Sequence, residues 1–352
     1  MNIVQKVRQW IREEKRYLWI LIVLALVYST FSILNTFSGP IQKEKPPLGS
    51  EDGVSEEKWL SAIQKDPSLQ LVFGGGLLAL TFFFFLGVAL SVRFLAQKAR
   101  GKFAIPWRGP DPEIGWNLRD VFHVVVILLL LSYILEFAVV LFFHLLRIRV
   151  PEETRLLWVT CFGDLALCLM ILCWVARKGD PISHLGLSKK AFPKNIFFGL
   201  TSYITLFPSL LVALFISIWL SDLFKIMPPD QPIQNFFMKE NSVGMVAFGL
   251  TLVLLMGPVV EEIFFRGFFY NALKVKWGKK WAILSSGVLF AVLHANLVGF
   301  LPIALLGCLL AYSYELTGSL FTSITIHVLH NSLVMVIFFL TDRFSQLFGV
   351  FQ

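Results

Sequence analysis

Long apolar runs alternate with short polar stretches along almost the whole of this 352-residue chain. An apolar run of about 20 residues is long enough to cross a bilayer as a helix. The pattern therefore predicts an all-α fold, a polytopic bundle of eight to nine transmembrane helices. The predicted spans are Tyr17–Phe37, Leu71–Leu95, Val121–Leu146, Leu156–Ala176, Ile196–Leu220, a sixth from Val243, a seventh through His294, Phe300–Leu316 and Leu320–Leu340.

The charged residues between the spans predict how the spans are oriented. Basic residues are concentrated in segments 1–16, 93–108, 177–194 and 274–280, whereas segment 38–70 is rich in acids. Because Lys and Arg are enriched in cytoplasmic loops, we expect a cytoplasmic N-terminus and an external C-terminus. The chain is thus predicted to be an integral protein of the cell's inner or plasma membrane.

The polar motifs divide the chain into three predicted parts. Residues 1–195 form an N-terminal membrane region of about four spans without a recognisable motif, with a short helix near Glu56–Lys65 in its acidic loop. Residues 196–340 form a catalytic helical core, and residues 341–352 form a C-terminal tail.

Composition supports the membrane class and excludes one class of partner. The chain is 56% hydrophobic and 15% charged, with a mean hydropathy of +0.72, whereas soluble domains are about 25% charged. Its net charge of +8 comes from cations at the ends of apolar runs, so we expect the lipid bilayer and not nucleic acid as its surroundings. The four cysteines lie in apolar runs without CxxC spacing and are interpreted as core residues.

The segment Gly257–Tyr270, GPVVEEIFFRGFFY, places three charges in an apolar run. Charges inside a membrane helix are costly and usually mark a functional site. Glu262 and Arg266 are four residues apart on a helix and are expected to form an ion pair, which leaves Glu261 free for chemistry. Pro258 is expected to kink the helix before the acids and make room for water and substrate. The alternative is a buried structural ion network.

Two histidines and an asparagine follow at spacings that match the acid pair. Glu261 lies 17 residues before a turn at Trp277-Gly278, and His294 lies 16 residues after it, so a helical hairpin would bring both to the same depth. His327 and Asn331 share one face of the last span. We expect these residues to line one intramembrane polar cavity that opens toward the cytoplasm. Glu136, His144 and Asp164 are interpreted as locally bonded structural residues.

The three motifs, in this order, resemble those of a known family. EExxxR (Glu261, Glu262, Arg266), FxxxH (Phe290, His294) and HxxxN (His327, Asn331) are similar to those of the CAAX protease and bacteriocin-processing family (CPBP or Abi), which includes type II CAAX prenyl proteases. The resemblance covers roughly residues 197–340. It implies an all-helical fold in which the first glutamate activates water. It also implies that the histidines and asparagine bind or polarise the reacting groups, while the second glutamate and the arginine support the site.

The favoured function is therefore an intramembrane endopeptidase of the glutamate type. Its expected substrate is a membrane-embedded or membrane-tethered peptide or protein, with prenylated CAAX proteins as one option. In a poorly hydrated cavity, desolvation raises the pKa of a carboxyl group toward the range in which it can act as a general base near neutral pH.

Three alternatives remain open from the residues themselves. No cofactor is expected, yet a glutamate and two histidines with an open fourth position could bind zinc, although no HExxH motif is present. A non-catalytic membrane scaffold or immunity protein on the same fold is the main alternative. A proton-relay transporter is a further one, and it would be expected to show inverted repeats, which we do not find.

Overall fold

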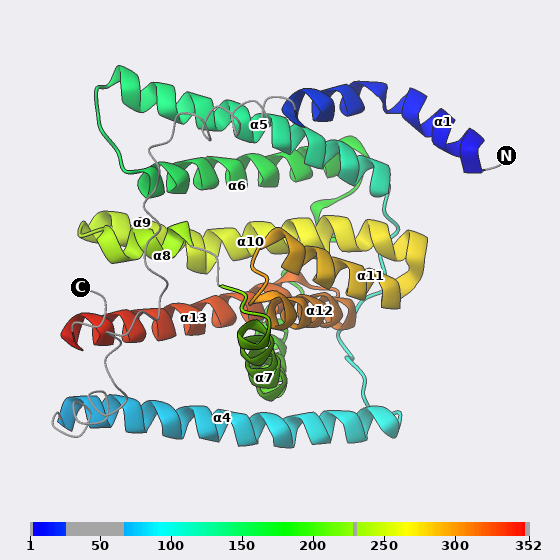
Figure 1. Cartoon of the computed structure of the whole chain (residues 1–352). Helices are drawn as coiled ribbons and strands as arrows, with labels where there is room; N and C mark the ends of the chain where they lie inside the picture. Colours follow the sequence, from blue (N-terminus) through cyan, green and yellow to red (C-terminus); the bar gives the residue numbers. More distant parts are fainter. Residues whose placement is uncertain (1–2, 26–66, 228–230, 349–352) are drawn as a thin grey trace.

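The computed structural model describes residues 3–25, 67–227 and 231–348 of the chain (Figure 1). Every regular element in these ranges is a helix, which confirms the predicted all-α fold. Residues 17–25 of the first predicted span are helical. The rest of that span and the predicted helix near Glu56–Lys65 lie outside the described residues.

Seven helices in the described part are long and apolar enough to cross a membrane. One of them, Val243–Leu293, reverses direction at Gly278, where φ is 75° and ψ is 170°. Glycine adopts a positive φ without steric cost, so the chain folds back at this point into two legs (Figure 1). The predicted hairpin is confirmed, and the span count agrees with a polytopic bundle. The chain is an integral membrane protein.

The N-terminal region contributes a short helix and three spans. These are α1 (Ile3–Glu13), α4 (Pro67–Ala99), α5 (Leu118–Leu145) and α6 (Glu152–Arg177). Helix α5 begins where it does because Asn117 and Asp120 form a capping box, in which each side chain accepts a hydrogen bond from the other's backbone N–H.

The C-terminal region contains the remaining elements. They are the 3₁₀-helix η1 (Ile182–Leu185), α7 (Phe192–Leu223), α8 (Pro232–Lys239), α9 (Val243–Thr251), the π-helix η2 (Leu252–Met256), α10 (Gly257–Glu262), the π-helix η3 (Ile263–Tyr270), α11 (Asn271–Leu293), α12 (Phe300–Thr317) and α13 (Leu320–Phe348). Helix α13 continues beyond the predicted end at Leu340, so most of the predicted tail belongs to this helix.

Helices α7 and α12 cross their neighbours steeply. Both are seen nearly end-on in Figure 1, whereas α4, α6 and α13 lie across the view. Helix α7 packs against α4, α12 and α13. The two crossing helices thus hold α13 in place beside α10, where it supplies the last polar residues of the site.

Two glycines allow α11 and α12 to approach closely. A Cβ on Gly287 would lie 2.5 Å from Sγ and 2.6 Å from the backbone nitrogen of Cys308, and a Cβ on Gly307 would lie 2.8 Å from Cα of Gly287. Only glycine fits at such distances. In membranes, small residues of this kind bring helix backbones together.

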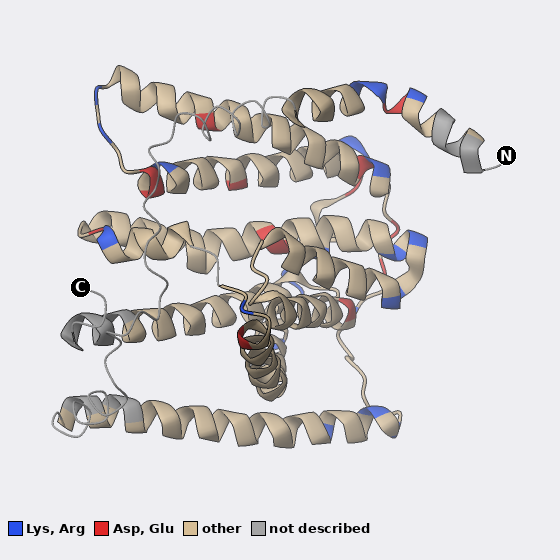
Figure 2. Cartoon of the chain, in the orientation of Figure 1, with Lys and Arg blue, Asp and Glu red and all other residues tan. Residues whose placement is uncertain are grey.

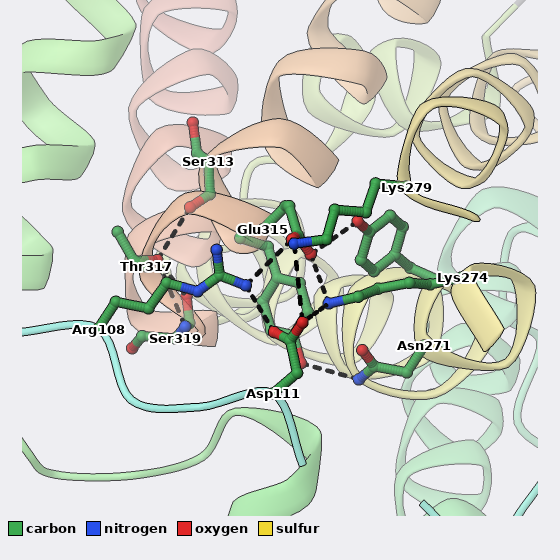
Figure 3. Close-up of polar contacts among 11 residues, drawn as sticks. Arg108, Asp111, Asn271, Lys274, Lys279, Ser313, Glu315, Thr317 and Ser319 are labelled. Carbon is green, nitrogen blue, oxygen red and sulfur yellow. Dashed lines mark hydrogen bonds and ion pairs between the residues drawn. The ribbon is translucent and has the colours of Figure 1, made fainter. Parts of the chain in front are cut away.

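Lys and Arg residues gather at the end of the bundle where α4 and α6 finish and α11 reverses (Figure 2). At this basic end, Glu315 is the centre of an ion-pair network that we call the Glu315 cluster (Figure 3). Its carboxylate lies 3.0 Å from Arg108, 2.7 Å from Lys274 and 2.6 Å from Lys279, and it accepts a hydrogen bond from Tyr270. The network ties the loop after α4 to the ends of α11 and α12.

Asp111 extends the Glu315 cluster on the loop side. It lies 2.5 Å from Arg108 and 2.9 Å from Lys274. Partial burial alone would raise the pKa of the Asp111 carboxyl, but the hydrogen bonds and charges of Lys274 and Arg108 outweigh it and hold that pKa below its usual value.

Candidate active site

A π-turn before the acid pair links α10 to α13. In a regular α-helix the N–H of Gly257 would bond to the carbonyl of Val253, but here it bonds to the carbonyl of Leu252. Pro258 follows and has no N–H to donate. The released carbonyl of Val253 accepts a hydrogen bond of 3.0 Å from Nδ2 of Asn331. The helix distortion expected from Pro258 therefore takes the form of a π-turn, and it positions Asn331.

Glu262 and Arg266 form the predicted ion pair. Oε1 of Glu262 lies 2.7 Å from Nη1 of Arg266, and both side chains are fully buried. The guanidinium also donates to the carbonyl of Gly307 at 3.0 Å and lies 4.7 Å from the ring centroid of Phe290. A buried pair needs such extra partners to offset the cost of desolvation.

His327 connects the two glutamates. Its Nδ1 lies 3.0 Å from Oε1 of Glu262, and its Nε2 lies 3.8 Å from Oε2 of Glu261. A carboxylate oxygen only accepts, so the Nδ1–H of His327 donates to Glu262. With Nδ1 as the donor to Glu262, Nε2 faces Glu261 with a lone pair in the neutral imidazole and with an N–H in the protonated one.

Glu261 points away from the ion pair, as its place on the helix predicted. Its side chain is 38% exposed and lines a cavity of about 760 Å³. Its Oε2 accepts no hydrogen bond from the described part of the chain. Of the two adjacent acids, only Glu261 is free to contact a molecule in the cavity.

Four of the six predicted site residues line this cavity, namely Glu261, His294, His327 and Asn331. Glu262 and Arg266 lie behind the cavity wall. His294 follows the last residue of α11, and its Nδ1–H donates to the carbonyl of Phe290 at 2.7 Å, which leaves Nε2 as an acceptor. Glu261 and His294 thus line the same cavity, from the two legs of the predicted hairpin.

Further polar residues line the cavity, among them His330 and Asp164. Nδ1 of His330 lies 3.3 Å from the hydroxyl of Tyr203, a residue that is 8% exposed. His330 was missed by the sequence reasoning, although it lies three residues after His327 and thus near the same helix face. Asp164 was interpreted as a locally bonded residue, but it faces the cavity from α6, in the region to which no role was assigned. Glu136 and His144 do not contribute to this cavity.

The cavity extends away from the basic end of the bundle, which differs from the predicted opening toward the basic loops. Its wall includes Glu153, Gln231 and Phe338, which lie at the opposite end. The basic end is filled instead by a hydrophobic cluster that contains Trp116 and Phe268. Distances along the helices predicted the depth of the site, but they could not predict which end large side chains would fill.

Residues 243–333 match the family model described as type II CAAX prenyl endopeptidase Rce1-like. This confirms the resemblance seen in the motifs, and the matched segment holds all six predicted site residues. It excludes Asp164 and Tyr203, which lie earlier in the chain.

One similar relative is the Bacillus subtilis (strain 168) protein named "Putative membrane peptidase YdiL". It is 33% identical to this chain over 82 residues, which is 23% of this chain and 34% of the relative. The match therefore spans about a third of that relative's length. No solved structure matches the chain.

Proposed function

We propose that this protein is an intramembrane endopeptidase in which Glu261 activates the attacking water. The observation that carries the proposal is the contrast between the two glutamates. Glu262 is held by Arg266 and His327, whereas the Glu261 side chain makes no hydrogen bond with the described residues and faces a cavity that three histidines and two asparagines also line. The match of residues 243–333 to a family of prenyl endopeptidases supports the same reaction class.

In the proposed reaction, Glu261 takes a proton from water while the water oxygen forms a bond to the carbonyl carbon of the peptide. Nε2 of His294, an acceptor, would orient the same water. As the C–N bond breaks, the proton passes from Glu261 to the leaving nitrogen. The products are a peptide with a new carboxyl group and a peptide with a new amino group.

We assign stabilisation of the oxyanion to His330 and Asn331. The buried hydroxyl of Tyr203 needs an acceptor for its proton, and Nδ1 of His330 is the partner within reach. His330 would then carry its proton on Nε2, where it can donate to an oxyanion. Asn331 uses one N–H on Val253 and keeps a second. Nε2 of His327 is a lone pair while that imidazole is neutral, so His327 is better suited to orient water.

The proposed substrate is a membrane-embedded or membrane-tethered peptide. The catalytic groups lie inside the helical bundle, so a scissile bond must be delivered at membrane depth. A prenylated CAAX-type protein is the substrate that the name of the matched family suggests.

The test compares the termini of all membrane proteins in cells that carry the intact chain or Glu261→Gln. New termini that require Glu261 would identify substrate and cleavage site together. Asp222→Asn is the matched control because Asp222 is an exposed acid on α7, outside the cavity. If the intact chain and Glu261→Gln give the same termini while both are folded in the membrane, the scaffold alternative is supported and the protease is not.

Variants of His330 then test the assignment of the oxyanion donors on a substrate identified in this way. Removal of such a donor lowers turnover by about 10²–10³-fold, so His330→Ala should lower kcat by that order and change KM little. His330→Gln keeps an N–H donor and should recover part of the loss. Tyr203→Phe should slow turnover less than His330→Ala. Unchanged kcat in all three variants would remove His330 from the mechanism.

A further inference from the structure

A second cavity, of about 490 Å³, lies between α4, α7 and α12. It shares no lining residue with the active-site cavity. It lies toward the basic end of the bundle, because its lining residues fall in the last turns of α4 and α12 and the first half of α7.

One wall of this second cavity carries Arg93, an arginine that has no partner among the described residues. Arg93 lies within the α4 span and is exposed. Ala99, the last residue of α4, is only about 9 Å farther along the axis. Arg93 makes no ion pair or hydrogen bond with the described residues. An arginine on a membrane-facing helix is costly unless it reaches an anion or the interface.

Arg93 is the only charged residue in the lining of the second cavity. No Asp or Glu is among its lining residues. Lys98 lies next to it, where its Nζ donates to the hydroxyl of Tyr312 at 3.0 Å and lies 5.8 Å from the ring centroid of Phe94. A negatively charged group would therefore be attracted to this end of the cavity.

The rest of the cavity wall is uncharged and largely apolar. Leu90, Leu206 and Leu309 each come from a different helix, and hydroxyl residues such as Thr205 and Ser209 also line it. The hydroxyls of Ser91 and Thr205 are already satisfied, because they donate to the carbonyls of Thr205 and Thr201, each at 2.7 Å. The cavity thus combines one cation, Arg93, with a wall that is otherwise uncharged and largely apolar.

We propose that this second cavity binds an anionic phospholipid from the leaflet at the basic end. The phosphate lies at Arg93, and one acyl chain runs between α4 and α7 toward Leu206. Basic pockets between membrane helices are known sites for anionic headgroups. Among the described elements α4 packs mainly against α7, so a lipid between them would also hold α4 to the bundle.

The experiment is native mass spectrometry of the full chain, purified in neutral detergent and titrated with phosphatidylglycerol or phosphatidylcholine. The intact chain should bind phosphatidylglycerol in preference to phosphatidylcholine. Arg93→Gln should weaken phosphatidylglycerol binding by roughly fivefold or more, which corresponds to the loss of one basic contact at a membrane surface. Arg100→Gln is the matched control, because Arg100 lies at the same end of α4 but does not line the cavity.

A second variant keeps Arg93 and fills the cavity instead. Ser202→Trp places a large ring among the lining residues and should also displace the lipid. Inorganic phosphate should not raise the melting temperature of the protein, whereas phosphatidylglycerol should. Equal weakening by Arg93→Gln and Arg100→Gln, equal binding of both lipids, or stabilisation by phosphate alone would each overturn the proposal.

Discussion

Nδ1 of His327 lies 3.0 Å from Oε1 of Glu262, the same oxygen that Arg266 contacts at 2.7 Å. One buried carboxylate oxygen therefore holds both a guanidinium and an imidazole. This contact ties α13 to α10 across the site, and it fixes the orientation of the histidine ring. The side chain of the adjacent Glu261 makes no hydrogen bond with the described residues and only faces Nε2 of His327 at 3.8 Å, so the two glutamates of the motif occupy different environments.

Replacement of Glu261 by Gln should stop the reaction without unfolding the protein. The amide keeps the size of the side chain but cannot take a proton from water. We expect turnover to fall by at least roughly 10²–10⁴-fold, as for loss of a general base, with a nearly unchanged melting temperature. Turnover per folded molecule, measured beside thermal unfolding, checks this. A fully active Glu261→Gln protein would contradict the assignment.

Replacement of Glu262 by Gln should act first on stability. Arg266 would become an uncompensated buried charge, and breaking one side of a buried pair costs about 3–5 kcal/mol. The amide oxygen of Gln can still accept the Nδ1–H of His327, but without the negative charge of the carboxylate. The double variant Glu262→Gln with Arg266→Met should be more stable than Glu262→Gln alone. The measurement is the melting temperature of the intact chain, of Glu262→Gln and of the double variant. A Glu262→Gln protein that is stable but inactive would show that the roles of the two acids are exchanged.

Local rules were sufficient to predict the spans, the ion pair and the hairpin. The Glu262–Arg266 contact follows from i,i+4 spacing, and the shared depth of Glu261 and His294 follows from the constant rise of a helix about a turn at Gly278. These features depend on residues close in sequence or on simple distances along helices. The structure confirms the ion pair and places Glu261 and His294 in the lining of one cavity.

Features that depend on packing between distant segments were not predicted. The contact of Asn331 with Val253 requires a π-turn 78 residues away in sequence. Asp164 enters the site because α6 packs against α10, and nothing in its own segment indicates this. The predicted opening toward the basic loops differs from the direction in which the cavity extends, since the sequence could not show that a cluster around Trp116 and Phe268 fills the basic end.

Substitution of Gly287 by Ala should destabilise the catalytic half. The added Cβ would meet the Cys308 backbone nitrogen at 2.6 Å, so α11 and α12 must move apart. Overpacking of this kind costs about 1–3 kcal/mol. The neighbouring Gly307 carbonyl, which binds Arg266, should shift as well. The measurement is thermal unfolding in detergent, with Gly163→Ala as the control, because a Cβ at Gly163 has no atom within 4 Å. Equal melting temperatures for both variants would contradict the prediction.

Neutralisation of Asp111 should weaken the attachment of the α4–α5 loop in a pH-dependent way. The pKa of Asp111 in the folded protein is below its usual 3.8, so its contribution to stability is present above that pH and is lost as pH falls through the folded pKa. The melting temperatures of the intact chain and Asp111→Asn should differ at pH 7 and converge below about pH 4. Because the side chain is 43% exposed, the difference should be modest and should shrink in salt.

Asp222→Asn is the control for this experiment. Asp222 also pairs with a lysine, but both side chains are more than 80% exposed. Such a pair contributes little to stability, so its loss should leave the melting temperature unchanged at every pH. A difference between the intact chain and Asp111→Asn that does not depend on pH would show that the ion pairs of Asp111 are not its cause.

Activity should not depend on a transition metal. The sequence has no HExxH motif, and the reaction proposed above is of the glutamate type. From these two points we expect turnover to persist in strong chelators and the purified protein to contain no stoichiometric zinc by elemental analysis. About one zinc per chain, lost together with activity and restored with it, would favour the zinc-dependent alternative.

Access to the active site should be from the end of the bundle opposite the basic loops. Leu156 and Val334 line the cavity and are 45% and 47% exposed. Cysteines introduced at these positions in a chain without its four native cysteines should react with a membrane-impermeant thiol reagent from that side and lose activity once modified. Lys276→Cys, at the basic turn, should react from the other side and stay active.

With the N-terminus in the cytoplasm, the cavity side is external, and a reporter after Gln352 should also be external. If Leu156→Cys and Val334→Cys react from the same side as Lys276→Cys, the substrate must enter past the basic end, and the filled region around Trp116 must open during the reaction.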